Sequence, residues 1–134
     1  MNLLMNRYAL TLAAFLLALA VGLGAFGAHA LATMVDAKAL ANWQTAVQYQ
    51  AIHALALLAL AVWMRLGAPS YVANVSWGLV LGTLLFSGSL YAYVLTAWKP
   101  LVFFTPIGGS VWLITWLVLA WLSAKNSSTP NETH

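Results

Sequence analysis

The stretch ALANWQTAVQYQAIHALALLALAVWM (residues 39–64) contains no charged side chain, although Lys38 precedes it and Arg65 follows it. A helix that crosses a bilayer needs about 20 predominantly apolar residues. Three further charge-free runs flank this stretch, at 8–35, 66–98 and 100–124. Each run is long enough for one crossing, and none is long enough for two crossings with a turn. The sequence therefore predicts four membrane-spanning helices, with both termini on the same side of the membrane.

The composition of the chain also favours a membrane protein. Hydrophobic residues make up 63% of the chain and charged residues make up 5%, whereas a soluble domain carries about 25% charged residues. Because so few charges cannot cover a water-facing surface, lipid is the expected solvent for most of the chain. The runs do not alternate polar and apolar residues, as the strands of a membrane barrel do. We therefore expect an all-α membrane protein whose four transmembrane helices form a compact antiparallel bundle with short loops.

The charges and the absence of cysteine exclude several kinds of function. The chain has no Cys, which excludes disulfides, thiolate metal sites and cysteine nucleophiles. Its net charge of +3 comes from basic residues scattered singly at the ends of the runs. Such residues anchor helices at the membrane surface and do not form a nucleic-acid footprint. The expected partners are the lipid bilayer and either a second copy of the chain or another membrane protein, with no nucleic acid.

The predicted transmembrane domain covers residues 1–123, and a polar tail (124–134) follows it. Its four helices are expected at about 8–28, 43–64, 75–97 and 105–123. Asn42 is the predicted N-cap of the second helix, and Thr105, which precedes Pro106, is the predicted N-cap of the fourth. The tail, AKNSSTPNETH, is short and polar, so we expect it to be disordered.

The N-terminal region shares part of its pattern with a secretory signal peptide. Arg7 precedes an apolar core, and Ala28-His29-Ala30 matches a small-x-small cleavage site. The apolar run is longer than the h-region of about 7–15 residues that signal peptides usually have. We therefore expect the first helix to be retained.

Two pairs of glycines are candidate helix-packing positions. Gly22 and Gly24 belong to ridges of small residues on the first helix, and Gly78 and Gly82 form a G-x-x-x-G pair on the third. Small residues at four-residue spacing allow helix backbones to approach closely in lipid. We favour packing within the chain as the role of these positions, with association between copies as the alternative.

Polar residues on the second helix indicate a candidate site inside the membrane. Gln50 and His53 are three residues apart and share one face of that helix. Because an unpaired amide is costly in hydrocarbon, both should face the bundle. Connectivity places further polar residues in the same half of the membrane. The whole candidate cluster is His29, Gln50, His53, Ser87, Ser89, Tyr91 and Thr105.

Two interpretations of this cluster remain open. The residues could bond the helices together and set their register, or they could form a small ligand or ion site open to one side, since intramembrane ionisable residues often mark function. Two histidines without a nearby Cys, Asp or Glu are a thin ligand set for haem or a metal, so we expect no cofactor and no metal. Ser87 and Ser89 lack a carboxylate-oriented base. We therefore expect no catalytic residue and no enzymatic activity.

Four stretches of the chain together resemble the membrane-protein family called domain of unknown function 423. They are GAFGAHAL (24–31), TAVQYQAIHALALL (45–58), LFSGSLYAYVLT (85–96) and TPIGG (105–109). The resemblance covers all four predicted helices in order, and every residue of the candidate cluster lies inside these stretches. It implies a short four-span protein of the bacterial cytoplasmic membrane, in which GAHA belongs to the family pattern and not to a cleavage site. It implies no biochemical activity.

The leading functional hypothesis is a non-enzymatic membrane protein that supports membrane integrity or a partner complex. The alternative is a small transporter or ligand-binding protein built on the polar cluster around His29 and His53.

The basic residues indicate how the chain is oriented in the membrane. Arg7, Arg65 and Lys125 lie on one side of the predicted spans, while Lys38 and Lys99 lie on the opposite side. This distribution favours both termini in the cytoplasm.

Overall fold

The fold consists of four long helices joined by short connections. The computed structural model describes residues 2–128. Its elements are α1 (Asn2–Ala28), η1 (Leu31–Thr33), α2 (Ala37–Arg65), α3 (Tyr71–Thr96), η2 (Lys99–Phe103) and α4 (Phe104–Ser127), where η denotes a 3₁₀ helix. No strand occurs within residues 2–128, and four helices are long and apolar enough to cross a membrane. The predicted all-α fold with four transmembrane helices is therefore confirmed.

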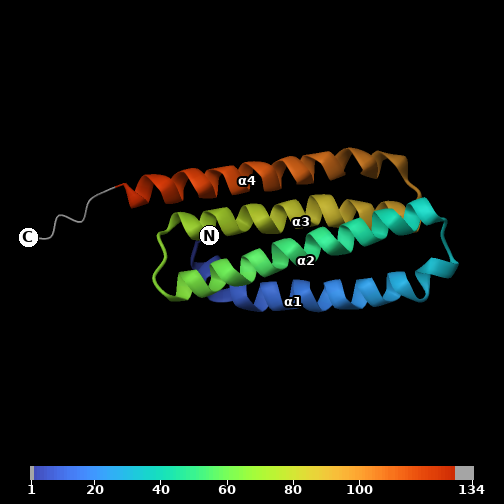
Figure 1. Ribbon diagram of the computed structural model, residues 1–134, viewed down its shortest axis with the longest axis horizontal. Coiled ribbons are helices and arrows are strands. Elements are labelled where there is room, and N and C mark those ends of the chain that lie inside the picture. The colour runs from blue at the N-terminus through green and yellow to red at the C-terminus, as the bar shows by residue number, and fades with distance from the viewer. Residues whose placement is uncertain (1, 129–134) are drawn as a thin grey trace, which may run out of the picture.

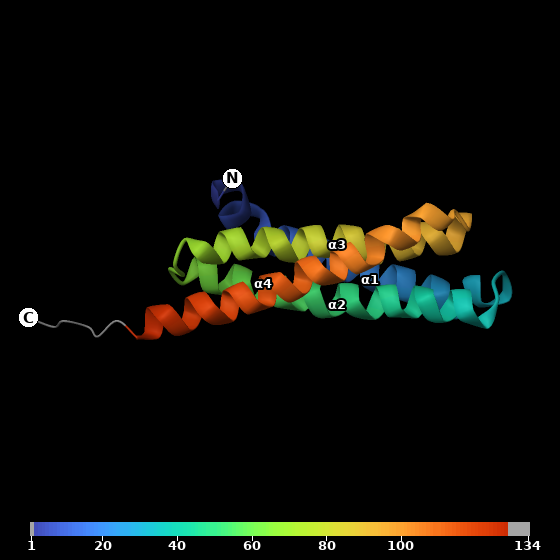
Figure 2. The same cartoon turned by 90° about the horizontal axis from the view of Figure 1, so that it is seen from above.

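The helices run antiparallel, with α2 between α1 and α3 (Figure 1). Figure 2 shows α4 crossing the bundle at an angle on its outer side. Helix α4 packs against α3, and in the described residues no Cα atom of α4 lies within 8 Å of α1 or α2. The buried residues of α4 are Gly108, Trp112 and Thr115. Any bond between α4 and α2 must therefore come from long side chains.

The helix ends differ from those predicted, mainly because helices continue into the headgroup region. Helix α2 begins at Ala37, since Asp36 and not Asn42 is its N-cap. The Asp36 Oδ1 atom accepts a hydrogen bond of 2.8 Å from the Ala39 backbone N–H. Thr105 is also not an N-cap, because η2 leads directly into α4 at Phe104 and no side chain caps that helix.

Helices α1 and α4 also extend past the predicted limits at residues 8 and 123. The single charges Arg7 and Lys125 are good helix formers, and their long side chains can reach the membrane surface. Residues 124–127 of the predicted disordered tail are therefore helical. Residues 129–134, the rest of that tail, lie outside the described residues.

Glycines allow α3 and α4 to approach closely. A Cβ atom at Gly82 would collide with the Trp112 indole, and one at Gly78 would collide with the side chain of Thr115. From the other side, Gly108 of α4 lies directly against the backbone of α3. Gly78 and Gly82, which the sequence pattern singled out, thus lie in the α3–α4 interface together with Gly108.

The two candidate glycines of α1 lie in different surroundings. A Cβ atom at Gly24 would lie 3.4 Å from Val47 Cγ1 of α2, an ordinary packing contact. Gly22 is exposed, and nothing lies within 4 Å of the position of its Cβ. The packing role predicted for Gly22 inside the chain is therefore not observed. Gly27 fills that role instead, since a Cβ there would lie 2.6 Å from Trp43 Cδ1.

Candidate functional site

Gln50 connects three helices in the half of the bundle that lies away from the termini. Its side chain is 3% exposed. The Nε2 atom donates a 2.8 Å hydrogen bond to the Leu16 carbonyl of α1, and the Oε1 atom accepts a 2.7 Å bond from the Tyr91 hydroxyl of α3. A carbonyl oxygen has two lone pairs, so Leu16 can accept this bond in addition to its helical one. Gln50 therefore joins α1, α2 and α3 at one level.

Serine hydroxyls form two further bonds between helices. The Ser87 hydroxyl of α3 donates a 2.8 Å bond to the Ala46 carbonyl of α2. The Ser89 oxygen lies 2.9 Å from the Phe86 carbonyl and 2.6 Å from the Thr105 hydroxyl of α4. Ser89 has a single O–H, which donates to the carbonyl, so Thr105 must be the donor to Ser89. These bonds join α3 to α2 and to α4.

His53 is held by a hydrogen bond at each ring nitrogen. Its Nδ1 atom lies 2.8 Å from the Tyr49 carbonyl, and its Nε2 atom lies 3.1 Å from the Trp116 indole Nε1 of α4. An indole N–H only donates, so Nε2 must be unprotonated and Nδ1 must carry the proton. The ring also stacks on Trp112, with centroids 3.7 Å apart and an interplanar angle of 4°. His53 is therefore a neutral residue, and both of its nitrogens are occupied by this chain.

The same tryptophan-on-glycine contact joins α1 to α2 and α3 to α4. Trp43 of α2 lies on Gly27 and donates a 2.8 Å bond from its indole to the Leu23 carbonyl of α1. Trp112 of α4 lies on Gly82 and donates a 3.2 Å bond to the Leu79 carbonyl of α3. In both cases the missing Cβ gives the indole access to a backbone carbonyl about one turn before the glycine.

Sequence reasoning missed these tryptophans as polar partners. The cluster predicted from the sequence contains no tryptophan, whereas the Trp43 side chain is 2% exposed and lies inside the bundle. Trp112 and Trp116 both donate hydrogen bonds between helices. The available signal was the pairing of each buried tryptophan with a glycine on the preceding helix.

His29 is not part of the cluster that the structure forms. The contact between Gln50 and Leu16 defines the register of α1 against α2. His53 lies one helical turn beyond Gln50, whereas the helix from Leu16 to His29 spans about 20 Å in the opposite direction. His29 is exposed, just after the end of α1. The structure thus brings Gln50 to Tyr91 and Ser89 to Thr105, and it keeps His29 far from His53.

The described residues contain no group of three or more His, Cys, Asp and Glu side chains that could hold a metal ion. Apart from His29, the residues of the candidate cluster form separate hydrogen bonds, each of which ends on another group of the same chain. Such an arrangement can orient helices, and it leaves no free nitrogen on His53. Gln50 keeps one amide N–H and lines a small, mostly apolar cavity of about 170 Å³.

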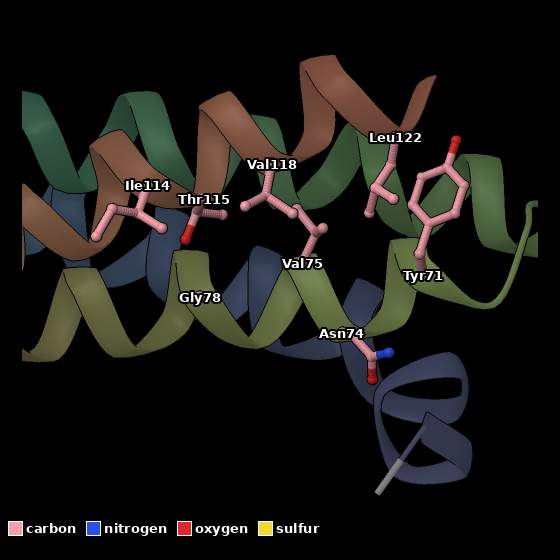
Figure 3. A pocket seen from close by; sticks show the side chains of 8 residues that line it. All are labelled: Tyr71, Asn74, Val75, Gly78, Ile114, Thr115, Val118 and Leu122. Atoms are coloured by element: carbon pink, nitrogen blue, oxygen red, sulfur yellow. The ribbon is translucent and has the colours of Figure 1, made fainter. Parts of the chain in front are cut away.

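A groove of about 360 Å³ lies between α3 and α4 in the other half of the bundle (Figure 3). Val75 and Val118 face each other across it, while the Asn74 side chain points away from α4. Thr115 also lines the groove, but its hydroxyl bonds to the Val111 carbonyl of its own helix. The groove is thus an apolar surface suited to lipid and not a site for polar chemistry.

The chain matches the family model described as "Protein of unknown function (DUF423)" over residues 23–109. All seven residues of the predicted cluster lie within this region, whereas Trp112 and Trp116 lie beyond it. The chain is 44% identical to a UPF0382 membrane protein of Haemophilus influenzae, over 92% of this chain and 98% of that protein.

Two other bacterial relatives are similar along most of their length. The UPF0382 inner membrane protein YgdD of Escherichia coli is 41% identical, over 85% of this chain and 87% of that protein. The UPF0382 membrane protein YwdK of Bacillus subtilis is 41% identical, over 80% of this chain and 88% of that protein. No solved structure matches the chain.

Proposed function

We propose, given that this chain belongs to the DUF423 family of membrane proteins, that it is a non-enzymatic scaffold that supports membrane integrity or a partner protein. The family resemblance drawn from the four sequence motifs is thus confirmed. The descriptions of the family and of the relatives name no activity. The proposal therefore rests on what the side chains inside the spans do.

The observation that carries the proposal is that the polar cluster is closed on itself. A transport or catalytic site needs polar atoms that can reach a substrate. Gln50 uses its amide nitrogen and oxygen for α1 and α3, and His53 uses both ring nitrogens. Bonds of this kind stabilise a membrane protein by about 0.6 kcal/mol each, and several together select one arrangement of the helices. This is the property that a scaffold requires.

The alternative function, transport or ligand binding through His29 and His53, has less support. The two histidines lie at different levels of the bundle, and His53 has no free nitrogen. A ligand at this position would first have to displace Trp116. We therefore assign the cluster to helix packing.

A partner helix has a suitable surface on α1. Ala14, Ala18 and Gly22 are exposed and four residues apart, so they form a ridge of small residues that faces away from the other helices. Such ridges allow a neighbouring helix to approach closely in lipid. We assign this α1 ridge to contact with a second copy or with another membrane protein.

The proposed location is the bacterial cytoplasmic membrane with both termini in the cytoplasm. The name of the Escherichia coli relative, an inner membrane protein, supports this location. Three basic residues on the terminal side against two on the other support the orientation. Because the chain has no cysteine, a single Cys at Ser127 can be labelled selectively. Labelling of that Cys from outside intact cells would refute the orientation.

Cysteine crosslinking in the native membrane tests the scaffold function. Single variants Gly22→Cys and Leu113→Cys place one thiol on the α1 ridge and one on an exposed position of α4. We expect oxidation to crosslink the Gly22 variant to a defined product, either a dimer or one partner, and to leave the Leu113 variant monomeric. Equal crosslinking at both positions would indicate random collision and would contradict the assignment of the α1 ridge.

A further inference from the structure

A groove with both polar and apolar walls lies at the end of the bundle opposite the termini. It consists of two cavities, of about 450 Å³ and about 210 Å³, which share the lining residues Lys38, Asn42 and Tyr93. The larger cavity continues along apolar side chains that include Phe86 and Leu90, and the smaller one reaches Asp36. We call the two cavities together the headgroup groove.

The polar residues of the headgroup groove have free hydrogen-bonding groups. Within residues 2–128, no hydrogen bond or ion pair engages the Lys38 ammonium, the Asn42 side-chain amide or the Tyr93 hydroxyl. This contrasts with Gln50 and Tyr91 deeper in the bundle, which bond to each other. Three donors thus line one groove without a protein acceptor, so each is available to an acceptor from outside the chain.

The groove residues are arranged in the order of the parts of a phospholipid. Asp36 caps α2 and lies outermost, and Lys38 follows in the first turn of that helix. Asn42 lies one turn deeper. On α3, Phe86 lies about 10 Å further into the membrane than Tyr93. From water inward, the groove therefore presents a carboxylate, then an ammonium, then neutral donors, then an apolar wall.

We propose that the headgroup groove binds one phospholipid whose headgroup carries a phosphate and a primary ammonium, as phosphatidylethanolamine does. Lys38 pairs with the phosphate, and Asn42 and Tyr93 donate to phosphate or ester oxygens. An acyl chain lies along the apolar wall at Phe86 and Leu90. This site is distinct from the scaffold function proposed above, because none of the residues that hold the headgroup bonds two helices together. Of the polar cluster, Thr105 lines the larger cavity, but its hydroxyl donates to Ser89.

Asp36 determines which headgroup fits. Its Oδ1 atom accepts the bond from Ala39 that caps α2, and its other carboxylate oxygen has no partner in the described residues. A negative charge beside Lys38 disfavours a purely anionic headgroup and favours one that carries its own ammonium. A choline group is positive too, but it has no N–H to donate to the carboxylate.

Native mass spectrometry of the purified protein in detergent tests the proposal. The probes are the dioleoyl forms of phosphatidylethanolamine, phosphatidylglycerol and phosphatidylcholine. We expect one phosphatidylethanolamine to be retained preferentially by the unmodified protein. Lys38→Ala should weaken its retention about tenfold, because a charge-assisted bond is lost. Lys38→Arg should preserve it, since a guanidinium also binds phosphate.

Lys99→Ala is the matched control, because Lys99 is exposed at the same end of the bundle and lines neither cavity. It should retain lipid like the unmodified protein. Asp36→Asn keeps a good N-cap residue but removes the charge. It should therefore leave the helix intact, as circular dichroism can check, and reduce the preference for phosphatidylethanolamine over phosphatidylcholine.

Two results would overturn the proposal. If Lys38→Ala and Lys99→Ala retain lipid equally, the lipid is bulk lipid and not bound at the groove. If the unmodified protein retains the three lipids equally, or prefers phosphatidylglycerol, the ammonium is not recognised by Asp36.

Discussion

Replacing Gln50 by Leu should destabilise the bundle by an amount that the structure allows us to work out. The change removes two bonds between helices, to Leu16 and Tyr91, and such bonds contribute about 0.6 kcal/mol each in membranes. The Leu16 carbonyl keeps its helical partner, but the Tyr91 hydroxyl loses its acceptor. Because Tyr91 is only partly buried, we take the lower end of the cost of an unsatisfied group, about 1 kcal/mol. The expected loss of unfolding free energy is about 2 kcal/mol.

The assay is reversible unfolding of the purified protein in mixed micelles, followed by far-UV circular dichroism during a titration with SDS. Gln48→Leu is the matched control, because Gln48 lies on the same helix, is exposed and makes no side-chain hydrogen bond in the described residues. Its unfolding free energy should stay within about 0.5 kcal/mol of the unmodified protein. A double-mutant cycle with Tyr91→Phe should give a coupling of at least about 1.6 kcal/mol with Gln50→Leu, because the double variant loses the shared bond only once and leaves no Tyr91 hydroxyl without an acceptor.

The reasoning would be refuted if Gln50→Leu were as stable as Gln48→Leu. In that case the hydrogen bonds to α1 and α3 would contribute nothing to the arrangement of the helices. A coupling of zero with Tyr91→Phe would refute the Gln50–Tyr91 bond in particular, even if Gln50→Leu were destabilising.

Three further predictions use the same unfolding assay. Trp112→Phe should lower the unfolding free energy by about 1–2 kcal/mol, because it removes a bond between helices and leaves a void. Trp77→Phe should lower it less, because the Trp77 indole nitrogen is buried without a partner among residues 2–128. Equal losses would contradict the Trp112 bond. Gly82→Leu should lower the unfolding free energy by at least about 2 kcal/mol, because the new side chain collides with Trp112. Gly22→Leu should lower it by under about 0.5 kcal/mol. The reverse order would contradict the close α3–α4 interface at Gly82. His53→Leu should lower the unfolding free energy by about 1 kcal/mol and shift the fluorescence emission of Trp116. An unchanged emission spectrum would contradict the bond between His53 and Trp116.

The number and order of the spanning helices could be predicted from sequence, because a charged side chain is costly inside a bilayer. Seven charges divide the chain into runs of one crossing each. The helix ends could not be located in the same way, since helices continue through the headgroup region, where a charge costs little. Asp36 and Asn42 are both good N-cap residues, and local sequence does not distinguish them.

The candidate site was predictable in part. The cost of a buried amide indicates that Gln50 faces the bundle, and Tyr91 was among its possible partners. The partners of His53 could not be found in this way, because Trp116 reaches it from a helix whose backbone does not approach α2. The distance between His29 and His53 depends on the register of α1 against α2, which the periodicity of each helix alone does not encode.

The tautomer of His53 tests the central claim most directly, because the claim requires that the polar atoms of Gln50, His53 and Ser87 are bound by other groups of this chain. The chain has three histidines, so long-range proton–nitrogen NMR spectra of the labelled protein in micelles can be assigned by comparison with His53→Leu. We expect a neutral ring at neutral pH, with the proton on Nδ1 and an unprotonated Nε2 that accepts from Trp116. A proton on Nε2, or a doubly protonated ring, would show that Trp116 does not occupy that nitrogen and would contradict the claim.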